Sequence, residues 1–223
     1  MLTPYRCAGL RIGRGRTKVE GMTTPQDLFL VSLDVPGEHP VEQGDLSLAL
    51  AGAELIDLLG ARALTLDGEL VVPGPVLTTG DRMLDEAGAR LRREEPYETV
   101  ADWLWRRGEG LAVAYYDVLE AAGQLAGERR HHWLPRRRGK ATAPADTAAR
   151  RHATDRWESR DPVLTGLAAA LGIGADRPAR EAPEDEAVVT VLIAVGDAVT
   201  ELDAVRERRR IENVAFDNIW RAP

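Results

Sequence analysis

The chain has 223 residues, and 44% of them are hydrophobic, so it can form a substantial core and wholesale disorder is excluded. Its formal net charge is −7, and residues 1–21 contribute five basic residues and one acid, so the remaining residues carry −11. An acidic body argues against general nucleic-acid binding through the surface, and we expect no nucleic-acid partner.

Three sequence features favour the cytoplasm. The single cysteine, Cys7, leaves no intramolecular disulfide and no CxxC metal site, which suits a reducing compartment. Uninterrupted apolar runs such as Val191–Val195 are far shorter than the roughly 20 residues of a membrane span. The N-terminus also lacks the apolar stretch of a secretory signal. We expect a cytoplasmic protein, or one that is peripheral on the inner face of the cell membrane.

The first 21 residues differ in charge from the rest. A helix start follows them, in which Thr24 is predicted to cap, Pro25 to take the first helical position, and Asp27 to lie three residues after the cap. We therefore expect residues 1–21 to be a basic N-terminal extension, either disordered or outside the natural protein. Residues 22–223 are predicted to form a single domain.

Apolar spacing and breakers predict a series of helices in chain order. The predicted helices cover residues 24–33, 46–60, 78–95, 97–110, 111–125, 148–157, 161–174 and 186–210. On the helix over 46–60 the polar residues Ser47, Glu54 and Asp57 fall on one narrow stripe, so most of its surface should be buried. The helix over 78–95 is predicted to be capped around Thr79.

Trp103 and Trp105 lie two apart on the predicted helix over 97–110, so one should be buried and the other partly exposed. Tyr115 and Tyr116 are expected in or near the core.

A β-hairpin is predicted after the helix over 46–60, with strands around 64–66 and 70–72 joined by Asp67-Gly68. The helix over 111–125 repeats the apolar spacing of 46–60 at an offset of 61, and it is also followed by a candidate hairpin. The expected fold is mostly α, a central helical bundle with peripheral amphipathic helices and two or more short β-hairpins. Helix plus hairpin is also the layout of a winged helix.

No catalytic signature is present in the sequence. It lacks HExxH, GxSxG, the phosphate-binding P-loop and a GxGxxG in the required context. The adjacent His131 and His132 would point to opposite sides of a strand, which suits joint metal ligation poorly. We therefore expect no enzyme, no cofactor and no metal site.

One stretch, "ERRHHWLPRRRGK", concentrates positive charge around an aromatic and aliphatic tip. Trp133 and Leu134 at a loop tip have the composition of an interfacial membrane anchor, and flanking cations favour anionic headgroups. The alternative is a solvated hairpin whose Trp133 packs on the body. The cations that we predict to bind anionic lipid are Arg129, Arg130, Arg136, Arg137, Arg138 and Lys140.

The order of four segments resembles the Golgi phosphoprotein 3-like family, including its bacterial, actinobacterial members. The segments are "TPQDLFLVSLD", "ALAGAELIDLLGARALTLDGELVV", "GDRMLDEAGARLRREEPYETVADWL" and "VLEAAGQL". The resemblance runs from about Met22 to about Arg138, with a looser helical tail beyond. It rests on the ordered series, because no single motif in it is diagnostic.

The resemblance implies a mostly helical fold and a lipid-binding, adaptor-like role. Eukaryotic members bind phosphatidylinositol 4-phosphate and glycosyltransferase tails, and they use a Trp and several Arg around an anionic pocket. Those pocket positions fall near Glu42, Ala51, Glu109 and Ala112 here, and none of the four is basic or aromatic. A family hairpin that inserts in the bilayer or joins subunits maps onto Arg129–Arg138.

The sequence therefore predicts a non-enzymatic, peripheral module that binds anionic phospholipid or a phosphoinositide headgroup, with the eukaryotic headgroup residues largely absent. A cytosolic protein–protein scaffold is the alternative, in which the same hairpin forms a homo-oligomer or binds a protein client. A winged-helix nucleic-acid binder is disfavoured, because the wing "TLDGEL" and the helix before it present acids that would repel phosphate.

Overall fold

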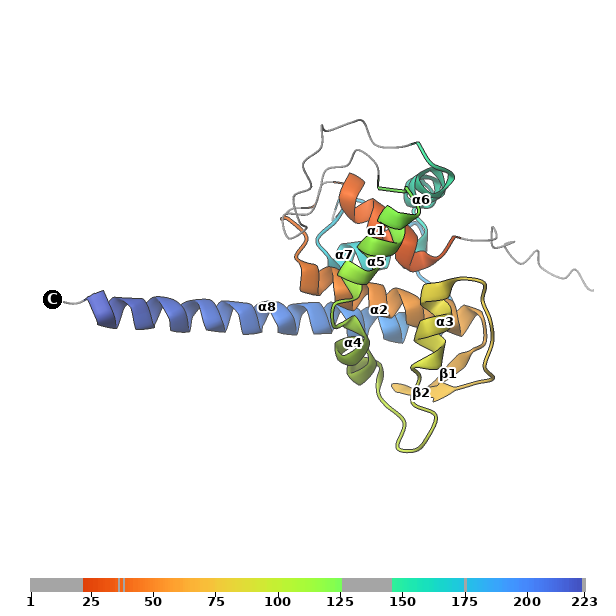
Figure 1. The fold of residues 1–223 in the computed structure, drawn as a ribbon, viewed down its shortest axis with the longest axis horizontal. Helices are drawn as coiled ribbons and strands as arrows, with labels where there is room; N and C mark the ends of the chain where they lie inside the picture. Colours follow the sequence, from red (N-terminus) through yellow and green to blue (C-terminus); the bar gives the residue numbers. More distant parts are fainter. Residues whose placement is uncertain (1–21, 36, 38, 126–145, 175, 222–223) are drawn as a thin grey trace, which may run out of the picture.

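Helix α2 (Gln43–Gly60) is the centre of the fold in the computed structural model, which describes residues 22–35, 37, 39–125, 146–174 and 176–221, with side chains described as far as residue 213. Nearly the whole surface of α2 is apolar and buried, as expected for a helix that is surrounded by others. Six helices contact it (Figure 1). They are α1 (Thr24–Asp34), α3 (Arg82–Ala89), α4 (Val100–Gly108), α5 (Leu111–Ala121), α7 (Pro162–Ala170) and α8 (Glu186–Arg221).

The remaining elements are peripheral. Helix α6 (Ala148–Glu158) packs on α1 and α7, and strands β1 (Leu64–Asp67) and β2 (Leu70–Pro73) follow α2 as an antiparallel pair. The described residues thus form eight helices and one hairpin, which confirms the mostly α fold class. The second predicted hairpin, around 129–138, lies outside the described residues.

The loop of the β1–β2 hairpin lies one residue later than the sequence predicts. Asp67 pairs with Leu70, so the two loop residues are Gly68 and Glu69. Gly68 has φ of +59°, a left-handed value that glycine adopts without steric cost. The prediction of a two-residue turn was right, but Asp67 belongs to the strand.

Two predicted caps were wrong, because the predicted cap residues make other contacts. Thr23 is the N-cap of α1, and the Thr24 hydroxyl donates instead to the Asp57 carboxylate on α2, at 2.8 Å. Asp81 caps α3 by accepting from the Leu84 amide at 2.9 Å. The Thr79 hydroxyl donates to Asp85 at 2.8 Å. Helix α3 is also shorter than predicted, and it ends at Ala89.

The predicted burial of Tyr115 and Tyr116 is confirmed, and so is the prediction that one of Trp103 and Trp105 is buried and the other partly exposed. Trp103 is fully buried and its indole N–H donates to the Ala51 carbonyl at 3.1 Å, whereas Trp105 is 40% exposed. Tyr115 and Tyr116 are both buried. These contacts fix α4 and α5 against the middle of α2.

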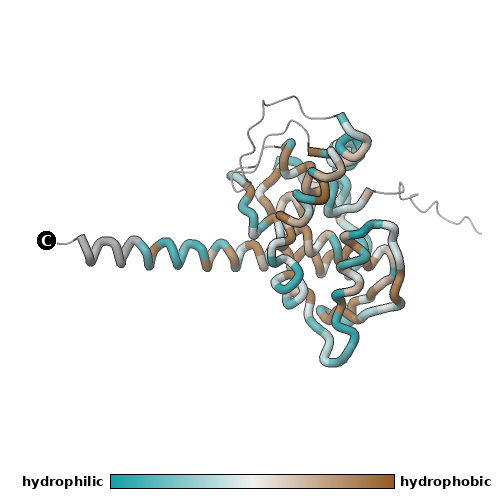
Figure 2. Tube along the Cα trace, in the orientation of Figure 1, coloured by the Kyte–Doolittle hydropathy of each residue, from teal (hydrophilic) through white to brown (hydrophobic). Residues whose placement is uncertain are grey.

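Helix α8 is 36 residues long and extends well beyond the body of the molecule (Figure 1). Its first half packs against α2, where Gly52 allows a close approach: a Cβ at this position would overlap the Val195 side chain. As far as residue 213, its projecting half is mostly hydrophilic (Figure 2). The sequence predicts this helix only as far as residue 210, and the structure continues it to Arg221.

Candidate functional site

The predicted lipid-binding segment lies outside the described residues. This applies to all eight predicted site residues, Arg129, Arg130, Trp133, Leu134, Arg136, Arg137, Arg138 and Lys140. The structure does place the elements on either side of the segment. Helix α5, which ends at Ala121, and helix α6, which begins at Ala148, both contact α1. The two helices that flank the segment in the sequence therefore pack on the same helix of the body.

The positions that the resemblance assigns to a headgroup pocket do not form a cationic site. Ala51 and Ala112 are completely buried, and the Ala112 amide donates to the Ser47 hydroxyl at 3.1 Å, so α2 and α5 are in direct contact here. Glu42 and Glu109 are exposed acids. A phosphate at this place would meet buried methyl groups and negative charge in place of guanidinium groups.

Arg206 of α8 contacts the start of α2 near these positions, and it is already engaged by two carboxylates. Its Nη1 lies 2.6 Å from Asp45 and 2.8 Å from Asp203. Burial alone would lower the pKa of Arg206, but the hydrogen bonds and charges of the two acids raise it. This guanidinium therefore remains charged and neutralises the start of α2, where Asp45 is largely buried.

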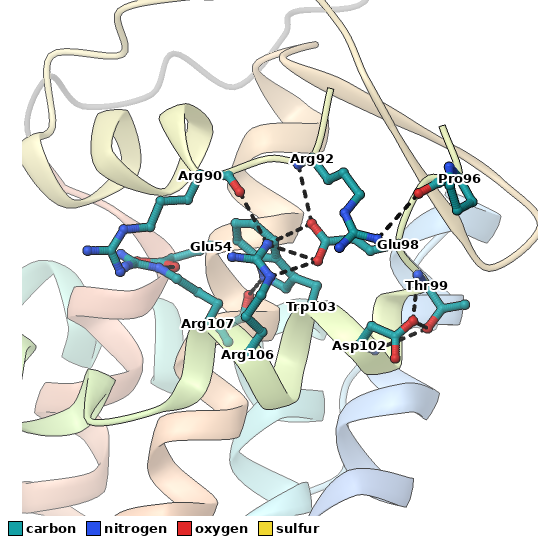
Figure 3. A network of polar contacts seen from close by, with 11 residues as sticks. Glu54, Arg90, Arg92, Pro96, Glu98, Thr99, Asp102, Trp103, Arg106 and Arg107 are labelled. Carbon is teal, nitrogen blue, oxygen red and sulfur yellow. Dashed lines mark hydrogen bonds and ion pairs between the residues drawn. The ribbon is translucent and has the colours of Figure 1, made fainter. Parts of the chain in front are cut away.

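A buried ionic network joins α2, α4 and α5. Figure 3 shows its members Glu54 and Arg107. The Arg107 guanidinium donates to both oxygens of Glu54, at 2.7 and 2.8 Å, and the Tyr115 hydroxyl donates to Glu54 at 3.0 Å. Side-chain exposure is 2% for Arg107 and 0% for Glu54. Arg107 also pairs with Glu86 of α3 at 3.1 Å.

This network has no access for a substrate, because its carboxylate is enclosed and already accepts three hydrogen bonds. Burial raises the pKa of Glu54, and the hydrogen bonds and charge of Arg107 oppose that rise. For Arg107, burial alone would lower the pKa, but Glu54 and Glu86 raise it, so the guanidinium stays charged. The arrangement orients helices and offers no free acid or base for catalysis.

Tyr115 should ionise at a higher pH than a solvent-exposed tyrosine. Burial and the Glu54 charge raise its pKa well above the usual value of about 10. Because an unfolded tyrosine ionises first, the contribution of Tyr115 to stability is constant below about pH 10 and is lost as the pH rises toward its folded-state pKa. Absorbance titration at alkaline pH should show Tyr115 ionising only with unfolding, and Tyr115→Phe should remove that step. A Tyr115→Phe titration that matches the unsubstituted chain would contradict this assignment.

A second polar cluster attaches α6 to the body. The fully buried Asp27 of α1 accepts from Arg156 at 2.7 Å, and its other oxygen lies 3.0 Å from His152 Nδ1. Arg156 also donates to Asp161, the N-cap of α7, at 3.0 Å, and to the Thr24 hydroxyl at 3.2 Å. Helices α1, α6 and α7 therefore meet at one guanidinium, although Asp27 of α1 lies 129 residues from Arg156 in the sequence.

The sequence gives only a weak signal for this cluster. His152 and Arg156 are four residues apart, so they lie on one face of a helix, but nothing local connects them with Asp27. The prediction treated Asp27 as a first-turn acid of a capped helix. Asp27 is buried because α6 packs on α1. The residues near Asp27 in the sequence give no sign of this contact between distant segments.

The described part of the chain contains no group of three or more His, Cys, Asp or Glu residues that could hold a metal ion. Of the helices in the described ranges, none has an apolar stretch long enough to cross a bilayer.

A comparison with protein-family models matches residues 25–215 to the family described as Golgi phosphoprotein 3 (GPP34). The chain belongs to the GPP34 family. The match covers most of the chain and confirms the resemblance predicted from the ordered segments. No curated protein matches the sequence. Membership of the GPP34 family is consistent with a lipid-binding module, and the kinds of partner that it suggests are lipid and protein.

Proposed function

We propose that this GPP34-family chain is a non-enzymatic, peripheral membrane protein that binds anionic phospholipid through residues 129–140, the basic segment. The observation that carries the proposal is the gathering of six cations and Trp133 in this segment of a chain whose net charge is −7. Arg129, Arg130, Arg136–Arg138 and Lys140 supply the charge. Trp133 and Leu134 supply apolar surface for the membrane interface.

The described residues support a charge-based mode of binding over a dedicated phosphoinositide pocket. Ala51 and Ala112 are completely buried where the resemblance places arginines, and Glu109, three residues before Ala112, is an exposed acid. Binding through the basic segment would depend on the surface charge of the membrane, with each cation contributing about 1 kcal/mol near an anionic surface. Any anionic phospholipid would then serve as ligand.

The elements on either side of the basic segment pack on the body of the protein. Helices α5 and α6 flank it and both contact α1, and α6 is attached by the Asp27–Arg156 cluster. We propose that residues 22–223 form one domain, in which the segment is held at both ends and presented to the membrane on the inner face of the cell.

Co-sedimentation with vesicles tests the proposal. The full chain should bind vesicles that contain phosphatidylglycerol and should not bind pure phosphatidylcholine, and binding should weaken as salt rises and the screening length shortens to about 8 Å. Vesicles with phosphatidylinositol 4-phosphate should show no preference beyond their charge. Equal binding to neutral and anionic vesicles, or none to either, would contradict the proposal. In the latter case, an oligomer that Trp133→Ala dissociates would favour the scaffold.

A further inference from the structure

A groove of about 700 Å³ lies between the β1–β2 hairpin, the start of α4 and the first half of α8. Its lining includes exposed apolar side chains, among them Trp105 at 40% and Ile193 at 60% exposure. Four exposed carboxylates line it, and no Lys, Arg or His is among its lining residues. The four acids are Glu69, Glu186, Asp197 and Glu201.

The side chains of these four acids form no hydrogen bond or ion pair with another group in the described ranges. Elsewhere in those ranges, acids such as Asp45, Asp27 and Glu54 are paired with arginine. Unpaired carboxylates beside exposed apolar surface suit a ligand that carries both positive charge and apolar side chains.

We propose that the basic N-terminal segment, residues 1–21, docks in this groove of its own chain. The segment has a net charge of +4, from five basic residues and Glu20, and apolar side chains such as Leu10 and Ile12 alternate with its cations. The segment therefore supplies positive charge for the unpaired carboxylates of the groove and apolar side chains for its exposed apolar surface. This inference goes beyond the membrane function and does not depend on it.

The segment is long enough to reach the groove. Its last residue adjoins Met22, and Thr24 is fixed to Asp57 by a hydrogen bond of 2.9 Å. Leu66, which lines the groove, is nine residues beyond Asp57, so the two are at most about 32 Å apart. A stretch of 21 residues spans up to about 70 Å when extended.

Cys7 makes a direct test available in the full chain, because it is the only cysteine and lies in the docking segment. A nitroxide label on Cys7 should broaden the backbone amide signals of groove residues such as Trp105 and Asp197 in the NMR spectrum. The broadening should decrease as salt is raised, since exposed charge pairs are screened.

Matched charge variants identify the groove as the docking surface. The triple substitution Glu186→Gln, Asp197→Asn, Glu201→Gln should weaken docking roughly tenfold and reduce the broadening accordingly. The control Asp117→Asn, Asp155→Asn, Glu158→Gln removes the same charge from exposed positions outside the groove and should leave the broadening unchanged.

Three results would overturn the proposal. One is the absence of broadening at the groove. Another is broadening that the groove variant leaves unchanged. The third is broadening of equal size when spin-labelled chains are mixed with separate isotope-labelled chains, which would show that a second copy occupies the groove. Thermal unfolding of each variant checks that the substitutions leave the fold intact.

Discussion

Replacing Arg107 by alanine is expected to lower the free energy of unfolding by about 3–5 kcal/mol. The substitution removes both hydrogen bonds to Glu54 and leaves a carboxylate with 0% exposure, for which only the Tyr115 hydroxyl remains as donor. For a chain of this size the melting temperature should fall by roughly 6–20 °C. Chemical denaturation and thermal unfolding measure the effect.

Arg90→Ala is the matched control for Arg107→Ala, since both arginines pair with the same oxygen of Glu86. Arg90 lies 3.0 Å from that oxygen and Arg107 lies 3.1 Å from it, but the Arg90 side chain is 56% exposed. Its loss should cost less than about 1 kcal/mol. Similar costs for the two variants would show that burial does not set the strength of this network.

The pH dependence of the Arg107→Ala variant provides a further check. Without the guanidinium, Glu54 loses the hydrogen bonds and the positive charge that oppose the effect of burial, so its pKa in the folded state rises further. The folded state then binds a proton at a pH where the unfolded state does not. A carboxylate whose pKa is raised on folding favours the fold at low pH and opposes it as the pH rises. The stability deficit should therefore shrink between neutral and mildly acidic pH. A deficit that grows over this range would contradict the account.

Arg156→Ala should also cost about 3–5 kcal/mol, because it removes the strongest partner of the fully buried Asp27. The loss should be concentrated at α6, since this guanidinium joins it to α1 and α7 at 2.7 and 3.0 Å. Hydrogen exchange of α6 amides should accelerate more than exchange in α2. The global loss is measured by denaturation.

Arg151→Ala tests whether position on α6 alone accounts for the Arg156 effect. Arg151 pairs with Asp146 at 2.8 Å, but the two side chains are 60% and 79% exposed, so its removal should cost less than about 1 kcal/mol. If Arg151→Ala accelerated exchange in α6 as much as Arg156→Ala, the Asp27 cluster would not be what attaches this helix.

The sequence predicts elements whose signals are local. Alternation around Asp67-Gly68 located the hairpin to within one residue, and the spacing of Trp103 and Trp105 separated the buried ring from the exposed one. The polar residues of α2 show the limit of such signals. The prediction assigned Glu54 to a narrow polar stripe on a mostly buried helix, and its partners Arg107 and Tyr115 lie 53 and 61 residues away.

The two wrong caps have the same physical origin. Thr24 and Thr79 match the residue types of an N-cap, but their hydroxyls donate to Asp57 and Asp85, and neighbouring residues serve as the caps. A capping preference of about 1 kcal/mol is comparable to the hydrogen bonds that replace it, so a contact with α2 decides at Thr24 and a contact with the first turn of α3 decides at Thr79. The predicted lipid-binding residues, all within 129–140, remain a prediction.

Vesicle binding of two triple variants tests the central claim most directly. Arg136→Gln, Arg137→Gln, Arg138→Gln removes three charges from the basic segment, and Arg208→Gln, Arg209→Gln, Arg210→Gln removes three exposed charges from α8. At about 1 kcal/mol per cation, the first should weaken binding to phosphatidylglycerol vesicles by about a hundredfold, and the second should leave it nearly unchanged. Equal losses in both variants, or a loss only in the α8 variant, would contradict membrane binding through residues 129–140.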